Sequence, residues 1–214
     1  MVVHATSCAR ACLFPRPGYA PCLSQLRLLP LDEPVPDVPG LVYVPEYVSH
    51  AEEHELLHAV DCEPWRTDWQ RRRQVYGVAY SGPQAGAPLA PVPEWLSWLV
   101  ARVRADGWLE APVVNVVINE YLPGQGIGPH RDHPGFGPHV AAISLGGATV
   151  LDLASSKEAA ARKVSLDVQP RSLWVLGGEA RSHWLHSIAP RHTDVVGGAK
   201  RPRERRVSIT LRTH

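Results

Sequence analysis

Lysine is scarce in this chain of 214 residues. Of the 22 lysine and arginine residues only Lys157, Lys163 and Lys200 are lysines, which leaves 19 arginines. Arginine carries a planar guanidinium that binds carboxylates and phosphates through two parallel hydrogen bonds. The formal net charge is only +1, so there is no global basic field that would by itself indicate a nucleic-acid partner. Any such contact must come from local clusters of arginine.

Cysteine and long apolar runs are also rare. The chain has four cysteines, and none of them has the paired C-x-x-C spacing of a zinc site. We therefore expect free thiols in a reducing compartment. No run reaches the roughly 18 to 20 apolar residues that a membrane span needs, and no charged and then apolar leader precedes a cleavage site. These absences predict a cytoplasmic protein without a membrane partner, which we expect to be a monomer.

Length and proline content divide the chain into two parts. A chain of 214 residues favours one well-buried domain with an appendage. Residues 1–39 contain seven prolines without sustained periodicity, so they can form neither a long helix nor an interior strand. The sequence predicts a poorly ordered extension over 1–39 and a folded domain over 40–214.

Hydrophobic periodicity in 40–214 is mainly that of short strands. Two helices are expected before residue 110, one capped by Ser49 and running to about Val60, the other beginning at Pro93 and ending at Gly107. The expected strands are Leu41–Val44, Val113–Tyr121, Val140–Leu145, Thr149–Leu153, Val164–Val168, Ser172–Leu176, His183–Ile188 and Arg206–Arg212. Many short strands separated by glycine and proline favour a closed or double-sheet architecture. The predicted fold is mainly β with flanking helices, a jelly-roll barrel.

The best candidate metal ligands are His130 and Asp132. One residue separates them, so both side chains project to the same side of an extended segment. The Gly- and Pro-rich segment 123–129 before them reads as a loop that can aim the pair inward. Such a pair together with one distant histidine is the 2-His-1-carboxylate set that holds Fe(II) and leaves positions open for ligands. The alternative is an ordinary surface pair joined by a hydrogen bond.

Three histidines compete for the place of the third ligand. His186 lies in an alternating strand far along the chain, where a jelly roll can bring it beside the first two ligands. Spacing alone does not exclude His183 and His133 as rivals. Zinc accepts a similar ligand set, but a redox-inert zinc site gives no reason for the arginines of the last strand, so iron is favoured.

The last expected strand has one polar and one apolar face. Arg206, Ser208, Thr210 and Arg212 alternate with Val207, Ile209 and Leu211. The two arginines are roughly 20 Å apart along an extended backbone, yet their long side chains can converge on a dicarboxylate. An edge strand blunted by charge is the alternative, and we assign that role to Arg201, Arg203 and Arg205 just before it.

Asn119 and Tyr121 alternate in the same way on their own strand. Their amide and phenol groups are uncharged donors suited to carboxylate oxygens. Alone, each is more often a satisfied polar group of the core. Together with the metal ligands and the arginines of the last strand they form a constellation that chance rarely supplies.

These motifs resemble the AlkB family of Fe(II)/2-oxoglutarate-dependent dioxygenases over about residues 40 to 214. The resemblance is carried by Asn119–Asp132, by the segment 170–179 before His186, and by Arg206–Arg212. It implies that His130, Asp132 and His186 ligate Fe(II). It also implies that Asn119 and Arg212 contact the 2-oxoglutarate carboxylate nearest the metal, with Tyr121 and Arg206 at the distal carboxylate.

The resemblance further implies an activity, namely oxidative demethylation or hydroxylation of alkylated bases in DNA, RNA or tRNA, with O2 and 2-oxoglutarate as cosubstrates. Two positions depart from the DNA-repair members, which usually carry Asn where this chain has Ser208 and an acidic residue where it has Pro134. Ser208 and the segment 124–127 look more like branches that act on RNA or on an unsettled substrate. A dioxygenase of protein side chains or small molecules is the alternative, and a non-catalytic ligand-binding barrel is a third class.

Substrate contacts are expected from a lid over about residues 62–90. This region mixes cations with aromatic residues, which can track phosphates and stack bases respectively. The candidate substrate residues are Trp69, Arg71, Arg72, Arg73 and Tyr76. The alternative is that the tryptophans of the lid belong to the core and that its arginines form a solvated face.

Overall fold

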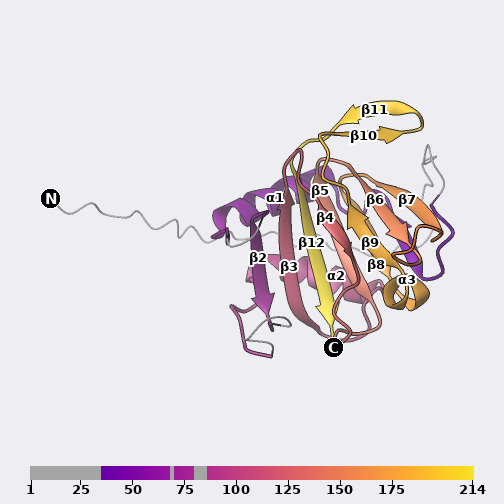
Figure 1. The fold of residues 1–214 in the computed structure, drawn as a ribbon. Helices are drawn as coiled ribbons and strands as arrows, with labels where there is room; N and C mark the ends of the chain where they lie inside the picture. Colours follow the sequence, from indigo (N-terminus) through magenta and orange to yellow (C-terminus); the bar gives the residue numbers. More distant parts are fainter. Residues whose placement is uncertain (1–34, 68–69, 80–85) are drawn as a thin grey trace, which may run out of the picture. The chain divides into compact units, whose positions relative to one another are not determined.

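The structure is a computed structural model that describes residues 35–67, 70–79 and 86–214 (Figure 1). Residues 33–214 form one compact unit. The extension expected over 1–39 lies outside the described residues except for its final few positions, so its boundary stays a prediction. No helix within the described ranges is long and apolar enough to cross a membrane.

Two antiparallel sheets and a hairpin carry the fold (Figure 1). The large sheet has the order β1 (Leu41–Val44), β8 (Ser172–Leu176), β5 (Val140–Gly146), β12 (Arg206–Thr213), β3 (Val113–Tyr121) and β2 (Arg73–Gly77). The small sheet has the order β4 (Ile127–His130), β9 (Leu185–Ile188), β6 (Thr149–Ala154) and β7 (Lys163–Val168), and β10 (Thr193–Val196) pairs with β11 (Ala199–Pro202). This architecture confirms the predicted fold, mainly β with two sheets.

The helices begin and end close to where the sequence predicts. In α1 (His50–Cys62) the Ser49 hydroxyl accepts from the Glu52 backbone while the Glu52 side chain accepts from the Ser49 backbone, a reciprocal cap that satisfies two otherwise unpaired donors. The helix expected from Pro93 consists of a short 3-10 turn, Glu94–Leu96, followed by α2 (Ser97–Ala105). A short third helix, α3 (Gly178–Ser182), was not expected.

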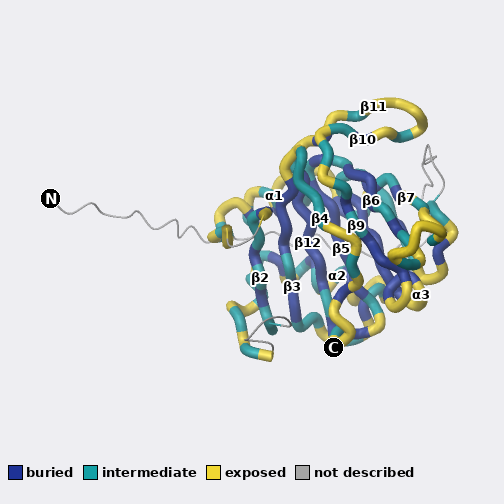
Figure 2. The backbone as a smooth tube through the Cα atoms, in the orientation of Figure 1, coloured by how far each residue is buried: buried dark blue, intermediate teal, exposed yellow. Residues whose placement is uncertain are grey.

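Each face of the large sheet is covered by a different partner. Val207, Ile209 and Leu211 of β12 are fully buried in a cluster with residues of α1 and α2, and burying each such side chain contributes roughly 1.5 to 3 kcal/mol. The opposite face packs on the small sheet, where Trp174 of β8 joins Leu151 of β6. Dark, buried strands therefore run through the centre of Figure 2. The alternation predicted for β12 places its polar residues between the two sheets.

The sequence did not predict four strands: β2, β4, β10 and β11. β4 falls partly within the segment 123–129 that was expected to be a loop. Its Ile127 and His130 pair with Ile188 and His186 across a register irregularity. At Gly126 an added Cβ would lie 2.2 Å from the Ile188 carbonyl oxygen, so the glycine permits a backbone approach that no other residue allows. Pairing with β9 overrides the loop-like composition.

The assignment of Arg201, Arg203 and Arg205 to a solvated edge is wrong for Arg203. Only 8% of Arg203 is exposed, and its guanidinium donates two hydrogen bonds of 2.8 Å to the fully buried Asp194 carboxylate. A fork of this kind joins β10 to the segment that leads into β12. The arginine is a buried structural ion-pair partner.

Candidate metal and cosubstrate site

The strand pair β4 and β9 brings the predicted metal ligands together. His130 and His186 are register partners, and their ring centroids are 4.2 Å apart. Asp132 Oδ2 lies 3.7 Å from His186 Nε2, and both residues are buried. The competing histidines, His133 and His183, are exposed. Of the three candidates for the third ligand, His186 is the one that lies beside the first two.

Hydrogen bonds and burial set the protonation state of these groups. His130 Nδ1 is 2.9 Å from the Gly128 carbonyl oxygen, so this nitrogen carries the proton and Nε2 keeps its lone pair. Burial, reinforced by the nearby His130, lowers the pKa of His186 to about 4, and His186 Nδ1 is buried without a partner. Burial raises the pKa of Asp132, but Arg212 and the two imidazoles lower it further, so the net shift is downward. At neutral pH His186 is therefore neutral and Asp132 is ionised.

The donor set fits Fe(II), although its atoms are not arranged around one point. No group of three or more His, Cys, Asp or Glu side chains in the described part of the chain has metal-binding geometry. Asp132 Oδ1 accepts from Arg212, with Oδ1 2.7 Å from Nε and 2.6 Å from Nη2, whereas Oδ2 is the oxygen that faces His186. Two imidazoles, one carboxylate and an unpartnered buried His186 nitrogen nevertheless match the chemistry of a facial-triad site.

Arg206 is a buried cation without an anion. It is 2% exposed, and its Nε donates to Ser144 Oγ at 2.7 Å, while its Nη1 has no partner. No acidic side chain among the described residues pairs with it, and burial lowers its pKa to about 10. Its guanidinium carbon lies 5.3 Å from the centre of the Tyr121 ring. An uncompensated buried charge costs several kcal/mol, so this position is suited to a bound carboxylate.

Polar residues extend from Arg206 towards the metal ligands. Arg206 is in register with Tyr121, and Ser208 with Asn119, so these side chains occupy one face of neighbouring strands. Arg212 lies at the other end of β12, where it holds Asp132 and also donates to Asn115 Oδ1 at 3.0 Å. The four residues predicted to bind the cosubstrate, Asn119, Tyr121, Arg206 and Arg212, all lie on this face. It faces the small sheet that carries the histidines.

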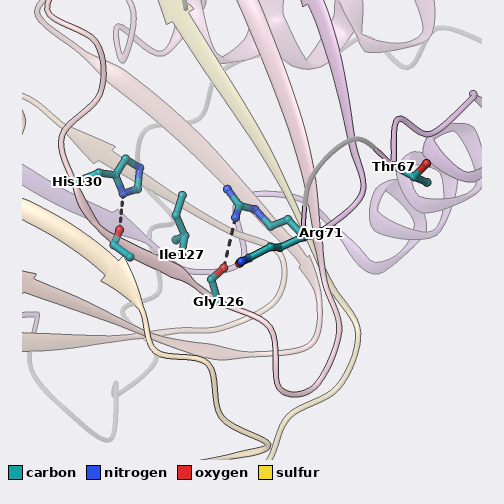
Figure 3. A pocket seen from close by; sticks show the side chains of 7 residues that line it. Thr67, Arg71, Gly126, Ile127 and His130 are labelled. Atoms are coloured by element: carbon teal, nitrogen blue, oxygen red, sulfur yellow. Dashed lines mark hydrogen bonds between the residues drawn. The ribbon is translucent and has the colours of Figure 1, made fainter. Parts of the chain in front are cut away.

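A cleft of about 890 Å³ opens beside His130 (Figure 3). Its walls are the segment 126–128 on one side and Thr67, Gln70 and Arg71 on the other. Arg71 points across the cleft and donates to the Gly126 carbonyl oxygen at 3.3 Å. Arg71 is thus the one predicted substrate residue that the structure places in the cleft lining.

The other candidate substrate residues divide between the two faces of the large sheet. Arg73 is in register with Asn119 and starts β2 on the same face. Arg72 pairs with the buried Glu120 and stacks on Trp65 at 4.5 Å, on the face covered by the helices. Tyr76 is buried in the helix-side core, where burial raises its pKa to about 12. The structure does not bring Arg72 and Tyr76 to the cleft, and Trp69 lies outside the described residues.

Arg181 of α3 is a site residue that the sequence reasoning missed. Its Nη1 donates to the Asp132 carbonyl oxygen at 3.1 Å, and its Nη2 donates to the His133 carbonyl oxygen at 2.8 Å. The side chain is 8% exposed. Both contacts fix the backbone that carries a metal ligand. The only signal in the sequence was an arginine close before His186, which is too weak to interpret alone.

Comparisons with known proteins agree with this geometry. Residues 45–212 match the family described as the 2OG-Fe(II) oxygenase superfamily. The chain is 32% identical over 201 residues to a zebrafish protein named probable RNA/DNA demethylase ALKBH6, covering 81% of this chain and 85% of that protein. It is 32% identical over 177 residues to the uncharacterized protein L905 of Acanthamoeba polyphaga mimivirus, covering 81% and 84%. Among solved structures, OsALKBH1 superposes with a TM-score of 0.60 at 17% identity, covering 82% of this chain and 99% of that one.

Proposed function

Since the chain belongs to the AlkB family within the 2OG-Fe(II) oxygenase superfamily, we propose that it oxidises alkylated bases of nucleic acid. The superfamily description names Fe(II) and 2-oxoglutarate, and the zebrafish relative is named for RNA and DNA demethylation. His130, Asp132 and His186 suit Fe(II), and the arginines of β12 suit 2-oxoglutarate. The proposed reaction converts 2-oxoglutarate and O2 into succinate and CO2 while one C–H bond of the base substituent is hydroxylated.

We assign the metal to His130, Asp132 and His186. Fe(II) bound there would supply the redox chemistry that activates O2, which no amino-acid side chain can do alone. His130 donates its Nδ1 proton to the Gly128 carbonyl oxygen and so presents its other nitrogen. The Arg212 guanidinium beside Asp132 keeps that carboxylate ionised. Both are features that a metal ligand requires.

The single observation that carries this proposal is the buried, anion-free Arg206. In the proposed complex it binds the distal carboxylate of 2-oxoglutarate together with Tyr121, while Asn119 and Arg212 serve the carboxylate at the metal end. The low dielectric around Arg206 strengthens that ion pair. Ser144, which accepts a hydrogen bond from Arg206, and Ala142 on the same strand are fully buried, so the surroundings of Arg206 lie away from solvent.

The cleft beside His130 and the names of the relatives support the proposed substrate class. An open cleft that borders a metal ligand suits a base presented from a single strand or flipped out of a duplex. Hydroxylation of an N-methyl carbon gives a hemiaminal, which releases formaldehyde and leaves the free amine. Nucleic acid and Fe(II) are both available inside the cell, so an intracellular location accompanies this proposal.

The test is a turnover assay with competing substrate pools. Purified protein is incubated with Fe(II), ascorbate and 2-oxoglutarate against methylated DNA, tRNA and histone peptides, and succinate and the mass of each pool are measured. We expect succinate release to rise with a nucleic-acid pool, which then loses about 14 mass units per demethylation, the mass of CH2, or gains about 16 per hydroxylation, the mass of O. A mass change confined to the peptides would overturn the substrate class. Absence of succinate in every pool would overturn the enzyme activity itself.

A further inference from the structure

Arg71 connects the wall of the cleft with the interior of the large sheet. It stands just before β2 and is only 9% exposed. Its Nε donates to Asn119 Oδ1 at 3.3 Å, and its Nη1 donates to the Gly126 carbonyl oxygen at 3.3 Å. Figure 3 shows the side chain crossing towards Gly126. The contact with Asn119 links Arg71, which lines the cleft, to one of the predicted cosubstrate residues.

The surroundings of Arg71 resemble those of Arg206. Its guanidinium carbon lies 5.2 Å from the centre of the Tyr121 ring, and that of Arg206 lies 5.3 Å from the same ring. No acidic side chain within the described residues pairs with either arginine. Two guanidinium groups therefore lie against one phenol ring, so Arg71 borders the residues predicted to bind the cosubstrate.

We infer that Arg71 is a positioning residue for 2-oxoglutarate that acts through Asn119. This inference rests on the function proposed above. The Asn119 amide can face the cosubstrate with either its oxygen or its NH2 group. Because Arg71 donates to Oδ1, the NH2 group is left to donate to a carboxylate. Without Arg71 the amide is free to flip, and its oxygen then faces the carboxylate repulsively. The arginine thus sets the polarity of one wall of the pocket.

This role differs from the one expected from sequence alone, which grouped Arg71 with substrate-binding arginines. It also differs from the role of its neighbour. Arg72 points to the opposite face of the sheet and pairs with Glu120. Arg71 and Arg72 are adjacent and carry the same charge, but Arg71 faces the pocket and Arg72 faces the helices. Substitution of Arg72 is therefore a matched control for substitution of Arg71.

The experiment measures 2-oxoglutarate affinity by calorimetry on the full-length, Mn(II)-loaded protein without turnover. We expect Arg71→Gln to weaken 2-oxoglutarate binding roughly tenfold or more, in line with the loss of one charge-assisted hydrogen bond. Mn(II) affinity should not change. Arg71→Lys keeps the charge and one donor and should fall between wild type and Arg71→Gln. Arg72→Gln should bind 2-oxoglutarate as wild type does.

A double-mutant cycle separates positioning from a merely structural role. If Arg71 acts through Asn119, then Asn119→Ala and the double variant Asn119→Ala with Arg71→Gln have the same 2-oxoglutarate affinity. Additive losses would overturn the inference. So would wild-type 2-oxoglutarate affinity in both Arg71→Gln and Arg71→Lys, even if oligonucleotide binding fell. If Arg71→Gln does not fold, Arg71→Lys replaces it in the cycle. A wild-type protein that binds no 2-oxoglutarate would instead remove the proposed function, and this inference with it.

Discussion

At the scale of single residues, Arg203 and Arg206 show how the same side chain serves two purposes. Both are buried, at 8% and 2% exposure. Arg203 forms an ion pair with the carboxylate of Asp194, whereas Arg206 pairs with no carboxylate among the described residues. The first arrangement stabilises the folded chain by itself. The second is costly until an anion binds, which is the behaviour expected of a binding residue.

Substitution by methionine separates these two roles. Arg206→Met removes an uncompensated charge, so the free energy of unfolding without ligand should not fall: the lost bond to Ser144 is worth about 1 kcal/mol, less than the several kcal/mol cost of the charge. Affinity for 2-oxoglutarate should fall roughly a hundredfold. Arg203→Met leaves the buried Asp194 with Arg191 as its remaining ion-pair partner, at 3.3 Å, and should lower stability by roughly 3 kcal/mol. Urea unfolding and calorimetry of both variants make the comparison, and a strongly destabilised Arg206→Met would contradict it.

A second comparison substitutes two histidines, one of them assigned to the metal and the other exposed. His130→Ala removes one of the two imidazoles assigned to the metal, so we expect Fe(II)-dependent succinate release to fall below detection. His183→Ala removes an exposed histidine that competed for the same role by spacing and should keep wild-type turnover. Succinate quantified with saturating Fe(II) is the measurement. Equal turnover of His130→Ala and wild type would reject the ligand assignment.

At the scale of single residues, the sequence predicts which face a side chain occupies only where the strand pattern is periodic. The two-residue alternation of β12 was enough to place Arg206 and Arg212 on one face, because the strand pairs regularly from Arg206 to Arg212. Arg71 and Arg72 precede β2, so no repeat tells which of them faces the pocket. The difference comes from tertiary contacts with Asn119 and Glu120. Local composition predicted a basic cluster but not its division between two faces.

At the scale of elements, the proposed metal ligands lie on or beside segments that are short and irregular. β4 has four residues, two of them glycine or proline, and composition alone describes a loop there. Its strand character comes from pairing with β9. α3 has five residues and no side-chain cap, so it carries little periodic signal. Elements this short form because of the segments that they pack against. The sequence therefore predicted the candidate ligands but not the short elements that hold them in place.

The contact between α3 and the backbone of Asp132 can be tested by substitution of Arg181. Arg181→Gln removes the paired donors that hold the Asp132 and His133 carbonyl groups. Supporting contacts of this kind are worth roughly 10- to 100-fold in metal affinity. Loss of the positive charge of Arg181 favours binding of a cation and so acts in the opposite direction on metal affinity. This effect offsets only part of the loss, because Asp132 already forms an ion pair with Arg212. We expect weaker Mn(II) binding by calorimetry, whereas Arg131→Gln, at an exposed position that bonds the Ser182 carbonyl, should bind Mn(II) normally.

At the scale of the whole domain, the two sheets divide the site between them. Both histidines belong to the small sheet, on β4 and β9, whereas Asn119, Tyr121, Arg206 and Arg212 belong to β3 and β12 of the large sheet. In the proposed complex, a metal with a chelating dicarboxylate would therefore bridge two layers that otherwise meet through side-chain packing. The jelly-roll class followed from the many short strands, but this division required the strand order, which no periodicity supplies.

Bridging makes the stability of the domain depend on both ligands together. With Mn(II) present, 2-oxoglutarate at a hundred times its Kd should stabilise the fold by about 2.7 kcal/mol, which for a domain of this size raises Tm by roughly 5 to 10 °C. Removal of the metal with EDTA should abolish most of that shift, because the keto acid then loses its anchor on the small sheet. Succinate has both carboxylates but no keto group and should shift Tm less. Scanning calorimetry measures all three cases, and an equal shift by 2-oxoglutarate with and without metal would show that the large sheet alone holds the cosubstrate.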